Sequence, residues 1–527
     1  MNIHYRWIAV SFALASIALP AIAGSCEDLA KISLPATTIS AAQNIPAGSY
    51  TPTGGFNLSD LPAFCRVAGV LKPSSDSNIL FEVWMPASGW TGKFQGVGNG
   101  GFAGSINYSG LADSIRHGYA AASTDTGHEA GVTDASWALN HPEKLADFGY
   151  RAIHEMTDKA KSVVRAFYGD APHHAYFSSC SNGGRQALME AQRFPADYDG
   201  IVAGAPANYW SHLLASAVYI SQSMLGDAYI PAAKIPAIDA AVIEACDALD
   251  GVKDGVIDNP SKCKFDPGKL LCAGAESNAC LTAPQVAGLR KIYDGMHDSK
   301  GQSLFPGLSH GGEAGSGGWP LWVSGPAPNK SLLYAFGTQF FKNAVFADPS
   351  WDLKALNPEH DVKLADDKIS LVMNSNNPDL SGFKKRGGKL IIYHGWSDAA
   401  IAPQNAINYY QSVVAKMGAR DTKSFVRLFM VPGMQHCGGG PGPNSFGQFG
   451  AASGDPRHDV AAALELWVDK GQAPEEIVAT KYKGQSPASG VARTRPLCAY
   501  PAFAKWNGKG SSDDAANFTC EKPAGAH

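Results

Sequence analysis

The most informative segment of this chain is Tyr176-Phe-Ser-Ser-Cys-Ser-Asn-Gly-Gly-Arg-Gln186. An aromatic, strand-like run from His173 precedes it, and a helical pattern that continues to Arg193 follows it. A strand that turns sharply into a helix, with a serine at the corner and small residues around it, is the nucleophile-elbow pattern. The segment therefore predicts that Ser181 is an activated nucleophile. The alternative is a plain turn rich in glycine and serine.

One residue departs from the elbow pattern. Ser179 stands two positions before Ser181, where the pattern has a glycine. Serine is small, but it lacks the freedom of glycine at positive φ. The rest of the chain therefore has to supply the context for an elbow.

Strand and helix patterns alternate on both sides of the elbow. Before it come a strand at 78–86, a strand at 118–124 and an amphipathic helix of about 22 residues at 145–167. After it come strands at 199–204, 388–393 and 425–431, with helices at 403–417 and 456–470. This order predicts an α/β fold, in which a mostly parallel sheet carries helices on both faces.

The alternation of strand and helix patterns stops between Ala207 and Lys385. Four cysteines and several runs rich in glycine and proline replace it. A chain of 527 residues is also longer than one simple core usually holds. We therefore expect a catalytic domain made of residues 24–206 and 386–527, with a large lid domain inserted at 207–385.

The first 23 residues have the pattern of a cleaved secretory signal. One positive charge, an apolar run from Trp7 to Leu19 and the motif Ala21-Ile-Ala23 follow one another. The segment before Cys26 loosely resembles a lipoprotein signal, but it lacks the usual large apolar residue. No later run reaches 18 apolar residues, so we expect no membrane span. The chain is thus predicted to be secreted or periplasmic.

Charge and composition exclude other classes. The net charge is −4 and charged residues make up only 17% of the chain. This composition does not give the basic surface that binding of a nucleic acid requires. A hydrophobic content of 45% is ample for a packed core. We expect a small-molecule substrate as the partner and make no prediction of the oligomeric state.

Ten cysteines in an exported chain predict disulfides. Sequence alone cannot fix the pairing, but clustering suggests four local loops: Cys26–Cys65, Cys246–Cys263, Cys272–Cys280 and Cys498–Cys520. This leaves Cys180 and Cys437, which adjoin Ser181 and His436. A disulfide holds two Cα atoms about 5.5–6 Å apart, so this bridge would keep the serine and the histidine within reach of one another. The alternative is a pair of free cysteines in the core.

Two more candidate catalytic residues follow predicted strands. Asp398 lies five residues after the strand at 388–393, and His436 lies five after the strand at 425–431. Serine, aspartate and histidine in this chain order, each past the carboxyl end of a strand, are typical of the α/β-hydrolase core. In this hypothesis His436 is the general base and Asp398 fixes its tautomer. His394 competes with His436 for the role of base.

A glycine-rich loop is the candidate for the oxyanion hole. Asn99-Gly100-Gly101 follows a strand-like run that begins at Lys93, the place where an α/β-hydrolase positions one oxyanion amide. The backbone N–H groups of Asn182 and of the Gly100–Gly101 turn would hold the oxyanion. The alternative is a plain hairpin turn.

Four aspartates lie close together in the predicted lid, at positions 247, 250, 254 and 258. Gly251 and Gly255 interrupt a helix there, and carboxylates this close repel one another. A hard cation with oxygen ligands, such as calcium, would resolve that repulsion, although the spacing is not that of an EF-hand. The alternative is a solvated turn. A bridge between Cys246 and Cys263 would close the loop.

These motifs together resemble those of the tannase and feruloyl esterase family over essentially the whole mature chain. The resemblance rests on residues 180–186, 247–258, 346–352, 393–398 and 436–439. It implies an α/β-hydrolase core, a lid domain with a structural calcium, and hydrolysis of aromatic carboxylic esters. It also implies that calcium would be bound by Asp247, Asp250 and Asp254 and by the backbone carbonyls of Val252 and Val256.

The choice of substrate depends on few residues. A terephthalate monoester carries a free carboxylate, which a bidentate arginine binds best. Arg290 is the only arginine between Asp247 and Lys385, so we rank feruloyl or similar hydroxycinnamoyl esters first, galloyl esters second and mono(2-hydroxyethyl) terephthalate third. A calcium-stabilised binding protein with a relic triad would have lost Ser181, Asp398 or His436, and all three are present.

Overall fold

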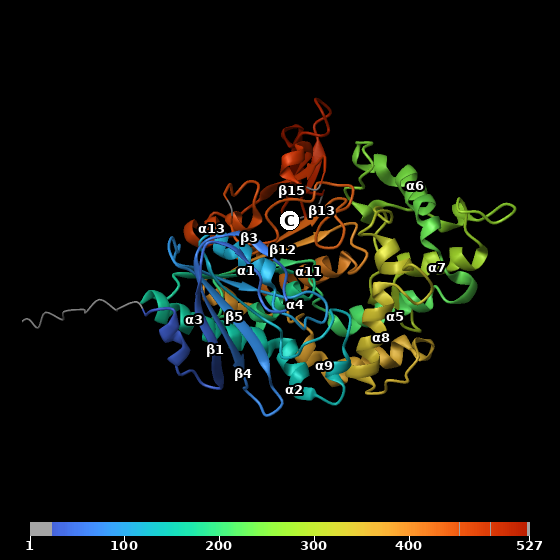
Figure 1. Cartoon of the computed structure of the whole chain (residues 1–527). Helices are drawn as coiled ribbons and strands as arrows, with labels where there is room; N and C mark the ends of the chain where they lie inside the picture. Colours follow the sequence, from blue (N-terminus) through green and yellow to red (C-terminus); the bar gives the residue numbers. More distant parts are fainter. Residues whose placement is uncertain (1–23, 453, 485, 524–527) are drawn as a thin grey trace, which may run out of the picture.

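A nine-stranded sheet forms the centre of the molecule in this computed structural model, which describes residues 24–452, 454–484 and 486–523 (Figure 1). The predicted signal segment, residues 1–23, lies outside the described residues. Along the sheet the strands are β1 (Thr37–Ile45), β4 (Phe64–Leu71), β5 (Ile79–Pro86), β7 (Ala120–Thr124), β6 (Lys93–Val97), β8 (His174–Cys180), β9 (Gly200–Gly204), β12 (Lys389–Gly395) and β13 (Val426–Val431). From β7 to β13 all neighbours are parallel, and β1, β4 and β5 form an antiparallel end.

Helices cover both faces of this sheet because its strands are apolar on both sides. On β8 the side chain of Phe177 lies on the face of the sheet that is covered by α3 (Ala152–Tyr168), α4 (Asn182–Arg193) and α11 (Gln404–Met417). The neighbouring Tyr176 packs against the face that carries α13 (Val460–Lys470), because successive side chains in a strand point to opposite faces. A further helix, α1 (Tyr108–Arg116), covers Trp84 and Ala121. This is the α/β-hydrolase arrangement.

The parallel strands end at a common edge. Cys180 of β8 is in register with Gly204 of β9, and Gly395 of β12 is in register with Val431 of β13. Loops that follow strands in register begin side by side. The turns after β8, β12 and β13 therefore meet at one edge of the sheet.

A mainly helical segment separates β9 from β12 in sequence. Figure 1 shows α5, α6, α7 and α8 beside the sheet, on the right of the view. The described secondary structure here comprises α5 (Trp210–Gln222), α6 (Ile235–Cys246), α7 (Ala283–Asp294), the hairpin β10 (Met296–His297) and β11 (Ser303–Phe305), α8 (Leu332–Phe340), α9 (Pro358–Met373), α10 (Ser381–Lys385) and short 3₁₀ and π turns. We refer to residues 207–385 as the lid, since they occupy the range in which the insertion was expected.

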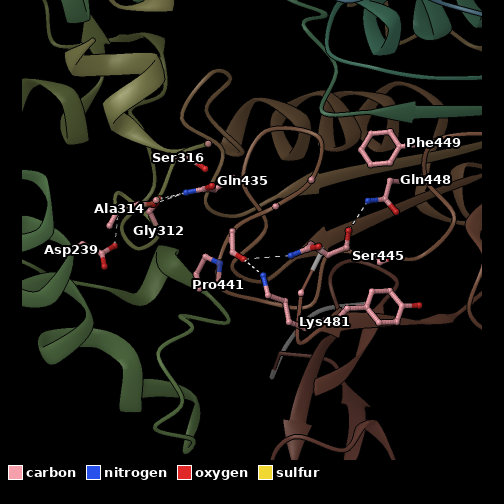
Figure 2. Close-up of a pocket in the computed structure, with 18 of the residues that line it drawn as sticks. Asp239, Gly312, Ala314, Ser316, Gln435, Pro441, Ser445, Gln448, Phe449 and Lys481 are labelled. Atoms are coloured by element: carbon pink, nitrogen blue, oxygen red, sulfur yellow. Dashed lines mark hydrogen bonds between the residues drawn. The ribbon is translucent and has the colours of Figure 1, made fainter. Parts of the chain in front are cut away.

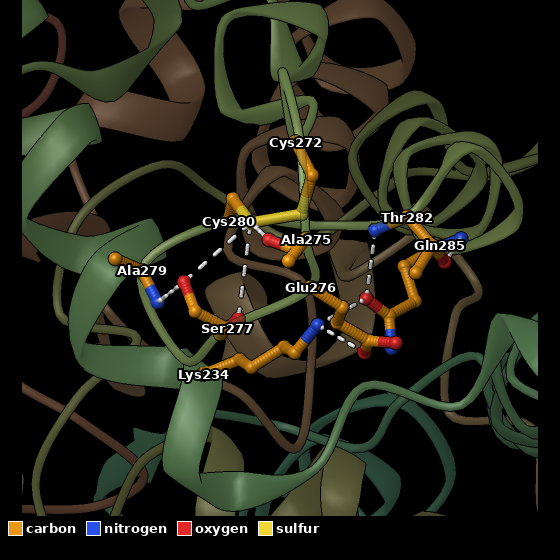
Figure 3. Close-up of a disulfide and its surroundings, with 9 residues drawn as sticks. All are labelled: Lys234, Cys272, Ala275, Glu276, Ser277, Ala279, Cys280, Thr282 and Gln285. Atoms are coloured by element: carbon orange, nitrogen blue, oxygen red, sulfur yellow. Dashed lines mark hydrogen bonds and ion pairs between the residues drawn. A yellow bond between two sulfur atoms is a disulfide. The ribbon is translucent and has the colours of Figure 1, made fainter.

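Two disulfides close short loops of the lid, and side-chain contacts hold one of these loops against the lid helices. Cys246–Cys263 and Cys272–Cys280 close loops within it. Beside the second bridge, Lys234 binds the carboxylate of Glu276 at 2.6 Å and the amide oxygen of Gln285 at 2.9 Å (Figure 3). These contacts tie the exposed loop to α6 and α7.

The sequence predicted one continuous α-helix at 145–167, but a π-helical turn interrupts it. The structure has α2 (Pro142–Ala146), a π-helical turn at Asp147–Arg151 and then α3. The guanidinium of Arg185 donates to the carbonyls of Phe148 and Gly149 at 2.9 and 2.8 Å. The turn is widened where carbonyls bind an arginine from another helix, and apolar spacing does not reveal such a contact.

Antiparallel elements were not anticipated at either end of the chain. Besides β1 and β4, a small hairpin joins β2 (Gly48–Tyr50) to β3 (Leu58–Leu61), and two more pair β14 (Glu476–Tyr482) with β15 (Val491–Cys498) and β16 (Phe503–Trp506) with β17 (Phe518–Glu521). Two short helices, α2 and α12 (Ala419–Lys423), complete the α-helices of the described residues. Within the described residues no helix combines the length and the apolar character that a membrane crossing requires.

Candidate active site

Ser181 occupies a strained corner between β8 and α4. Its backbone has φ 67° and ψ −124°, a conformation that a residue with a side chain rarely adopts and that nucleophile elbows require. Asn182 is the first residue of α4, so its N–H group has no acceptor within the helix. The corner thus presents a serine hydroxyl and a free backbone donor together.

Ser179 fits the elbow because its neighbours lack side chains. A Cβ atom on Gly183 would lie 1.8 Å from Ser179 Oγ, and one on Gly98 would lie 2.8 Å from it. The serine therefore takes up space that two glycines leave free. The departure from the elbow pattern is compensated locally, and the strained turn is retained.

Asp398 and His436 are directly joined. Nδ1 of His436 lies 2.8 Å from Asp398 Oδ2. The other carboxylate oxygen accepts the backbone N–H groups of Ala400 at 2.8 Å and Ile401 at 3.0 Å. Burial opposes ionisation of Asp398, but His436 and the hydrogen bonds to it outweigh burial and hold the pKa of this carboxyl well below its usual range.

His394 is the less suitable base. Its ring is fully buried and does not line the cavity described below, with Nε2 3.0 Å from the carbonyl of Ile401 and 3.1 Å from Asp398 Oδ2. The side chain of His436 is 11% exposed and lines that cavity together with Ser181. His394 is therefore placed to orient Asp398, and His436 is placed to exchange protons with a bound molecule.

The structure forms five disulfides, with the pairing that the sequence suggested: Cys26–Cys65, Cys180–Cys437, Cys246–Cys263, Cys272–Cys280 and Cys498–Cys520. In the bridge between Cys180 and Cys437 the Cα atoms are 6.0 Å apart. It joins the residue before Ser181 to the residue after His436. In the described part of the chain no hydrogen bond joins the Ser181 hydroxyl to His436, and such contacts often tighten when substrate binds.

An apolar cavity of about 330 Å³ opens onto Ser181. We call it the apolar cavity. It is lined by Ser181, Asn182, His436, the disulfide Cys180–Cys437 and the Gly100–Gly101 turn from the core, and by aromatic and aliphatic side chains that include Trp210, Leu213, Leu214, Trp322, Leu333 and Phe336 from the lid. The described lining contains no lysine, arginine, aspartate or glutamate. A flat, neutral, aromatic group fits these surroundings.

The candidate oxyanion residues lie at this cavity. Gly100, Gly101 and Asn182 all line it. Gly101 has φ 53°, and a Cβ there would lie 2.5 Å from the carbonyl of Val132, so the turn needs glycine at that position. The two candidate sets of backbone donors thus lie in separate loops that line the same cavity as Ser181.

The sequence assigned no role to Arg185. Its side chain is fully buried, donates to the side chain of Asn182 at 2.7 Å and has no carboxylate partner among the described residues. It lies over the rings of Phe148 and Trp210. Burial lowers the pKa of Arg185 to about 9. Its place within the elbow helix was the one signal that could have revealed this cation beneath the site.

A glycine-rich lid loop contacts both catalytic loops. Gln435 Nε2 donates to the carbonyls of Gly312 at 2.9 Å and Ala314 at 2.7 Å. A Cβ on Gly312 would lie 2.5 Å from the side chain of Ser397. Since Ser397 precedes Asp398 and Gln435 precedes His436, the lid is fitted directly against the loops that carry both residues.

The only arginine between Asp247 and Lys385 does not lie at the apolar cavity. Arg290 on α7 is half-exposed and pairs with Asp266 at 2.7 Å. It does not line the apolar cavity. The cavity therefore has no cation for a free carboxylate of a substrate.

The acidic loop is folded by its own hydrogen bonds and by two arginines. Asp247 accepts the N–H groups of Gly255 and Val256 at 3.0–3.2 Å. Asp254 pairs with Arg493 at 2.9 Å and Arg495 at 2.6 Å, from β15. Within the described residues no three His, Cys, Asp or Glu side chains are arranged to hold a metal ion. The calcium site stays a prediction.

Comparison with known proteins gives one family. A family model described as tannase and feruloyl esterase matches residues 65–521. An uncharacterized esterase of Xanthomonas campestris is 45% identical, over the whole of this chain and 96% of that protein. A probable feruloyl esterase B-2 of Aspergillus flavus is 36% identical over 83% of each chain. The crystal structure of feruloyl esterase B from Aspergillus oryzae has 30% identity and a TM-score of 0.87, and it covers 94% of this chain and 99% of that one.

Proposed function

The chain belongs to the tannase and feruloyl esterase family of carboxylic-ester hydrolases, and on that premise we propose that it hydrolyses feruloyl or similar hydroxycinnamoyl esters with Ser181, His436 and Asp398. The observation that carries the proposal is the apolar cavity, in which a neutral aromatic lining ends at Ser181 and His436. Five disulfides support an extracytoplasmic location.

In the first half of the reaction Ser181 Oγ attacks the ester carbonyl carbon while its proton passes to Nε2 of His436. The tetrahedral intermediate then collapses, and the alcohol leaves with the proton from His436. In the second half, water attacks the acyl-enzyme with His436 as base, which releases the acid and restores Ser181. Asp398 keeps the imidazole in the required tautomer and stabilises its charged form.

Backbone donors would stabilise the intermediate. In this proposal the N–H groups of Asn182 and of the Gly100–Gly101 turn donate to the developing oxyanion. One such donor is typically worth about 3–4 kcal/mol of the barrier. Arg185 supports this set by donating to the side chain of Asn182 at 2.7 Å, which fixes that residue at the start of α4.

The lining of the apolar cavity also ranks the acyl groups. A galloyl ring would bring three hydroxyl groups into a lining with few polar partners, and each unpaired group costs free energy. A terephthalate monoester would bring a carboxylate to a lining without a cation. A feruloyl ring carries one hydroxyl and one methoxy group, so it is the best match of the three.

Hydrolysis of methyl ferulate, methyl gallate and mono(2-hydroxyethyl) terephthalate tests this ranking. We expect kcat/KM to fall in that order, and Ser181→Ala to abolish all three activities while the protein remains folded. More than a few per cent of residual activity in Ser181→Ala contradicts the assignment of the nucleophile. A higher kcat/KM for methyl gallate than for methyl ferulate contradicts the proposed substrate.

We also propose that the acidic loop binds a structural calcium ion, held by Asp247, Asp250 and Asp254 and by the carbonyls of Val252 and Val256. Burial, together with Asp254 and Asp247, raises the pKa of Asp250, and Asp258 Oδ1 is buried without a hydrogen-bond partner in the described residues. Both observations indicate that the negative charge of the acidic loop is not fully compensated by the protein, and a bound cation would neutralise it. The two arginines supply only part of that compensation.

Chelation tests the calcium proposal. A chelator should lower the melting temperature more than it lowers turnover per folded molecule, because the ion stabilises by binding only the folded state. Asp250→Asn should remove most of this sensitivity, and Asp266→Asn, in an exposed pair outside the loop, should retain it. An unchanged melting temperature in a sample that metal analysis shows to be free of calcium contradicts the proposal.

A further inference from the structure

The two candidate parts of the oxyanion hole belong to different elements. The N–H group of Asn182 lies at the start of α4, whereas Gly100 and Gly101 lie in the turn after β6. Donors stabilise an oxyanion because their positions are fixed before the reaction begins. The disulfide between Cys180 and Cys437 joins the elbow to another loop, so a different contact must hold the turn in place relative to α4.

Gln186 connects this turn to α4. It lies in the second turn of that helix, and only 2% of it is exposed. Its Oε1 accepts the backbone N–H of Asn99 at 2.9 Å, and its Nε2 donates to Oδ1 of the same residue at 3.2 Å. Since Asn99 directly precedes Gly100, one side chain of α4 holds the residue at which the turn begins.

The orientation of both side-chain amides follows from their partners. Nδ2 of Asn99 lies 2.7 Å from the carbonyl of Thr124 and 2.9 Å from the carbonyl of Ser105, and only a donor suits two such acceptors. Oδ1 of Asn99 therefore faces Gln186 and takes a hydrogen bond from its NH₂ group. The remaining oxygen of Gln186 is then free to accept the backbone N–H of Asn99. One arrangement of the two amides thus satisfies every group.

The backbone before the turn approaches Gln186 closely. A Cβ atom on Gly98 would lie 2.6 Å from Oε1 of Gln186, so a larger residue there would displace the amide. The carbonyl of Asn99 also accepts Nδ2 of Asn182, the residue with the first oxyanion donor, at 3.4 Å. Three hydrogen bonds thus join α4 to Asn99, and a glycine before it leaves room for them.

The far end of the turn is attached to another part of the core. The N–H of Phe102 donates to the carbonyl of Val132 at 2.8 Å, and Nε2 of His128 lies 2.8 Å from the carbonyl of Phe102. Both partners belong to the loop after β7, so these contacts do not tie the turn to α4. The distance between the two donor sets is therefore set at Asn99.

The proposed base is held by a different glutamine. Gln435, in the loop after β13, donates to the carbonyls of Gly312 and Ala314 in the lid (Figure 2). Among the described residues the side chain of Gln186 makes its hydrogen bonds to Asn99. A change at Gln186 should therefore act on the oxyanion donors and leave the base in place.

We propose that Gln186 is a positioning residue, which acts through Asn99 to hold the Gly100–Gly101 turn at the distance from Asn182 that the developing oxyanion requires. The inference rests on the proposed function, because it assigns both donor sets to one oxyanion. Gln186 is not among the described residues that line the apolar cavity, so it does not contact the substrate. Its effect should appear in the transition state and be small in substrate binding.

The first variant, Gln186→Leu, removes both amide groups and keeps most of the volume. We expect its kcat on methyl ferulate, per folded molecule, to fall at least about tenfold, because loss of one oxyanion donor costs about a hundredfold or more and a displaced donor loses part of its effect. KM should change by less than about threefold. The acid limb of the pH–rate profile reports protonation of the base, so it should stay where it is in the wild type.

Two inhibitors separate the transition state from the ground state. In the trifluoromethyl ketone analogue of ferulic acid, Ser181 Oγ adds to the carbonyl carbon, the carbonyl oxygen becomes an oxyanion and the serine proton passes to His436. Coniferyl alcohol has the same ring but no carbonyl group. We expect Gln186→Leu to weaken inhibition by the ketone by about the factor by which kcat/KM falls, and to leave inhibition by the alcohol unchanged. Equal weakening of both would indicate a distorted cavity and would overturn the inference.

The second variant, Gln186→Glu, keeps the size of the side chain. A protonated carboxyl can accept the N–H of Asn99 and donate to its Oδ1, as the amide does, whereas a carboxylate cannot donate. The ratio of the variant kcat to the wild-type kcat should therefore fall, by about tenfold, as the pH rises and the buried carboxyl ionises. Arg185 and Asp125, the charged residues next to Gln186 and Thr124 in the sequence, are present in both proteins, so the ratio removes their own titration.

A buried glutamine in the lid provides the matched control. Gln285 is 5% exposed, and both groups of its side chain form hydrogen bonds, but these bonds fasten α7 within the lid (Figure 3). Gln285→Leu should lower the melting temperature without lowering the kcat of folded molecules or changing inhibition by the ketone.

The outcomes separate this inference from the proposed function. If the wild-type enzyme fails to hydrolyse methyl ferulate, the proposed function is wrong. If the wild type is active but Gln186→Leu keeps a near-normal kcat, Gln186 does not position the turn. If Gln186→Leu does not fold, Gln186→Glu decides: a ratio to the wild type that stays constant with pH would overturn the inference, and a ratio that falls as the pH rises would support it.

Discussion

Ser179 and Gly183 share one small space at the elbow, so each residue is tolerated because of the other. The Cβ of an alanine at 183 would lie 1.8 Å from Ser179 Oγ and 2.5 Å from Ser179 Cβ. We expect Gly183→Ala to lower the free energy of unfolding by about 1–3 kcal/mol, the usual effect of overpacking, and to lower kcat because the elbow shifts.

The double variant Gly183→Ala with Ser179→Gly should recover most of both losses. After the serine is removed, the nearest remaining atom is the carbonyl of Asn99, at 3.3 Å. Urea unfolding and kcat on methyl ferulate measure the two effects, and the coupling between the sites follows from the double-mutant cycle. A double variant that is as impaired as Gly183→Ala would show that the clash with Ser179 is not the cause.

Two histidines contact the same oxygen of Asp398, and they should differ in their effect on catalysis. His436→Ala removes the proposed base and should abolish turnover. His394→Gln keeps a donor near Nε2 that can still reach the carbonyl of Ile401, so we expect kcat to fall by no more than about tenfold. The kcat of His394→Ala should fall further, because Asp398 loses its contact with the imidazole of His394.

Steady-state rates for the three histidine variants, at a pH where the wild-type rate is constant, provide the measurement. The pattern expected of a positioning residue is rescue by glutamine. A loss in His394→Gln that equals or exceeds the loss in His436→Ala would make His394 the base.

At the scale of elements, the disulfide between Cys180 and Cys437 fixes the distance between the loops after β8 and β13. We expect the double change Cys180→Ala with Cys437→Ala to lower kcat at least about tenfold in folded protein, because a displacement of about 1 Å can cost on the order of a hundredfold. KM should change little, since Trp210, Trp322 and Phe336, the large aromatic side chains of the cavity lining, all come from the lid.

Both cysteines must be replaced together, because a single change leaves a thiol that can mispair. The Cys498→Ala and Cys520→Ala pair removes a bridge between β15 and β17 and serves as the control for a general loss of stability. Near-normal kcat in a well-folded Cys180/Cys437 variant would contradict a positioning role for this bridge.

The sequence predicted the elements that follow local rules. Ser181, Asp398 and His436 could be placed because each follows a buried apolar strand, and parallel strands end at one edge. The widened turn at Asp147–Arg151 and the role of Arg185 could not, because both depend on one contact between helices far apart in the chain. Strands such as β1 and β14 were not predicted, because they are only partly buried and their sequences lack a clear apolar period.

At the scale of the whole molecule, one buried carboxyl couples the docking of the lid to pH. Glu313 lies in the lid loop that Gln435 binds, and its carboxylate accepts the hydroxyl of Tyr293 at 2.7 Å and the N–H of Gly311 at 2.9 Å. Burial raises its pKa to about 7, against the hydrogen bonds from Gly311 and Tyr293, while Asp239 raises it further.

A carboxyl with a raised pKa binds more protons in the folded than in the unfolded state. The free energy of unfolding should therefore decrease as the pH rises from the ordinary pKa of 4.5 through about 7, by at most on the order of 3 kcal/mol from this group. Glu313→Gln keeps the acceptor for Tyr293 and cannot ionise, so it should match the wild type near pH 5 and exceed it near pH 8. Urea unfolding across that range measures the difference, and a constant difference between the two proteins would contradict this assignment.

The bridge between Cys180 and Cys437 has a topological consequence. It closes residues 180–437 into one covalent ring that contains α4, β9, the whole lid, β12 and β13. A protease that cuts once inside the lid opens this ring without dividing the molecule, since the two fragments remain joined beside the serine and the histidine. Cleavage in the lid would therefore leave the catalytic pair tethered, and new chain ends could be introduced there while the covalent link between the two catalytic loops is retained.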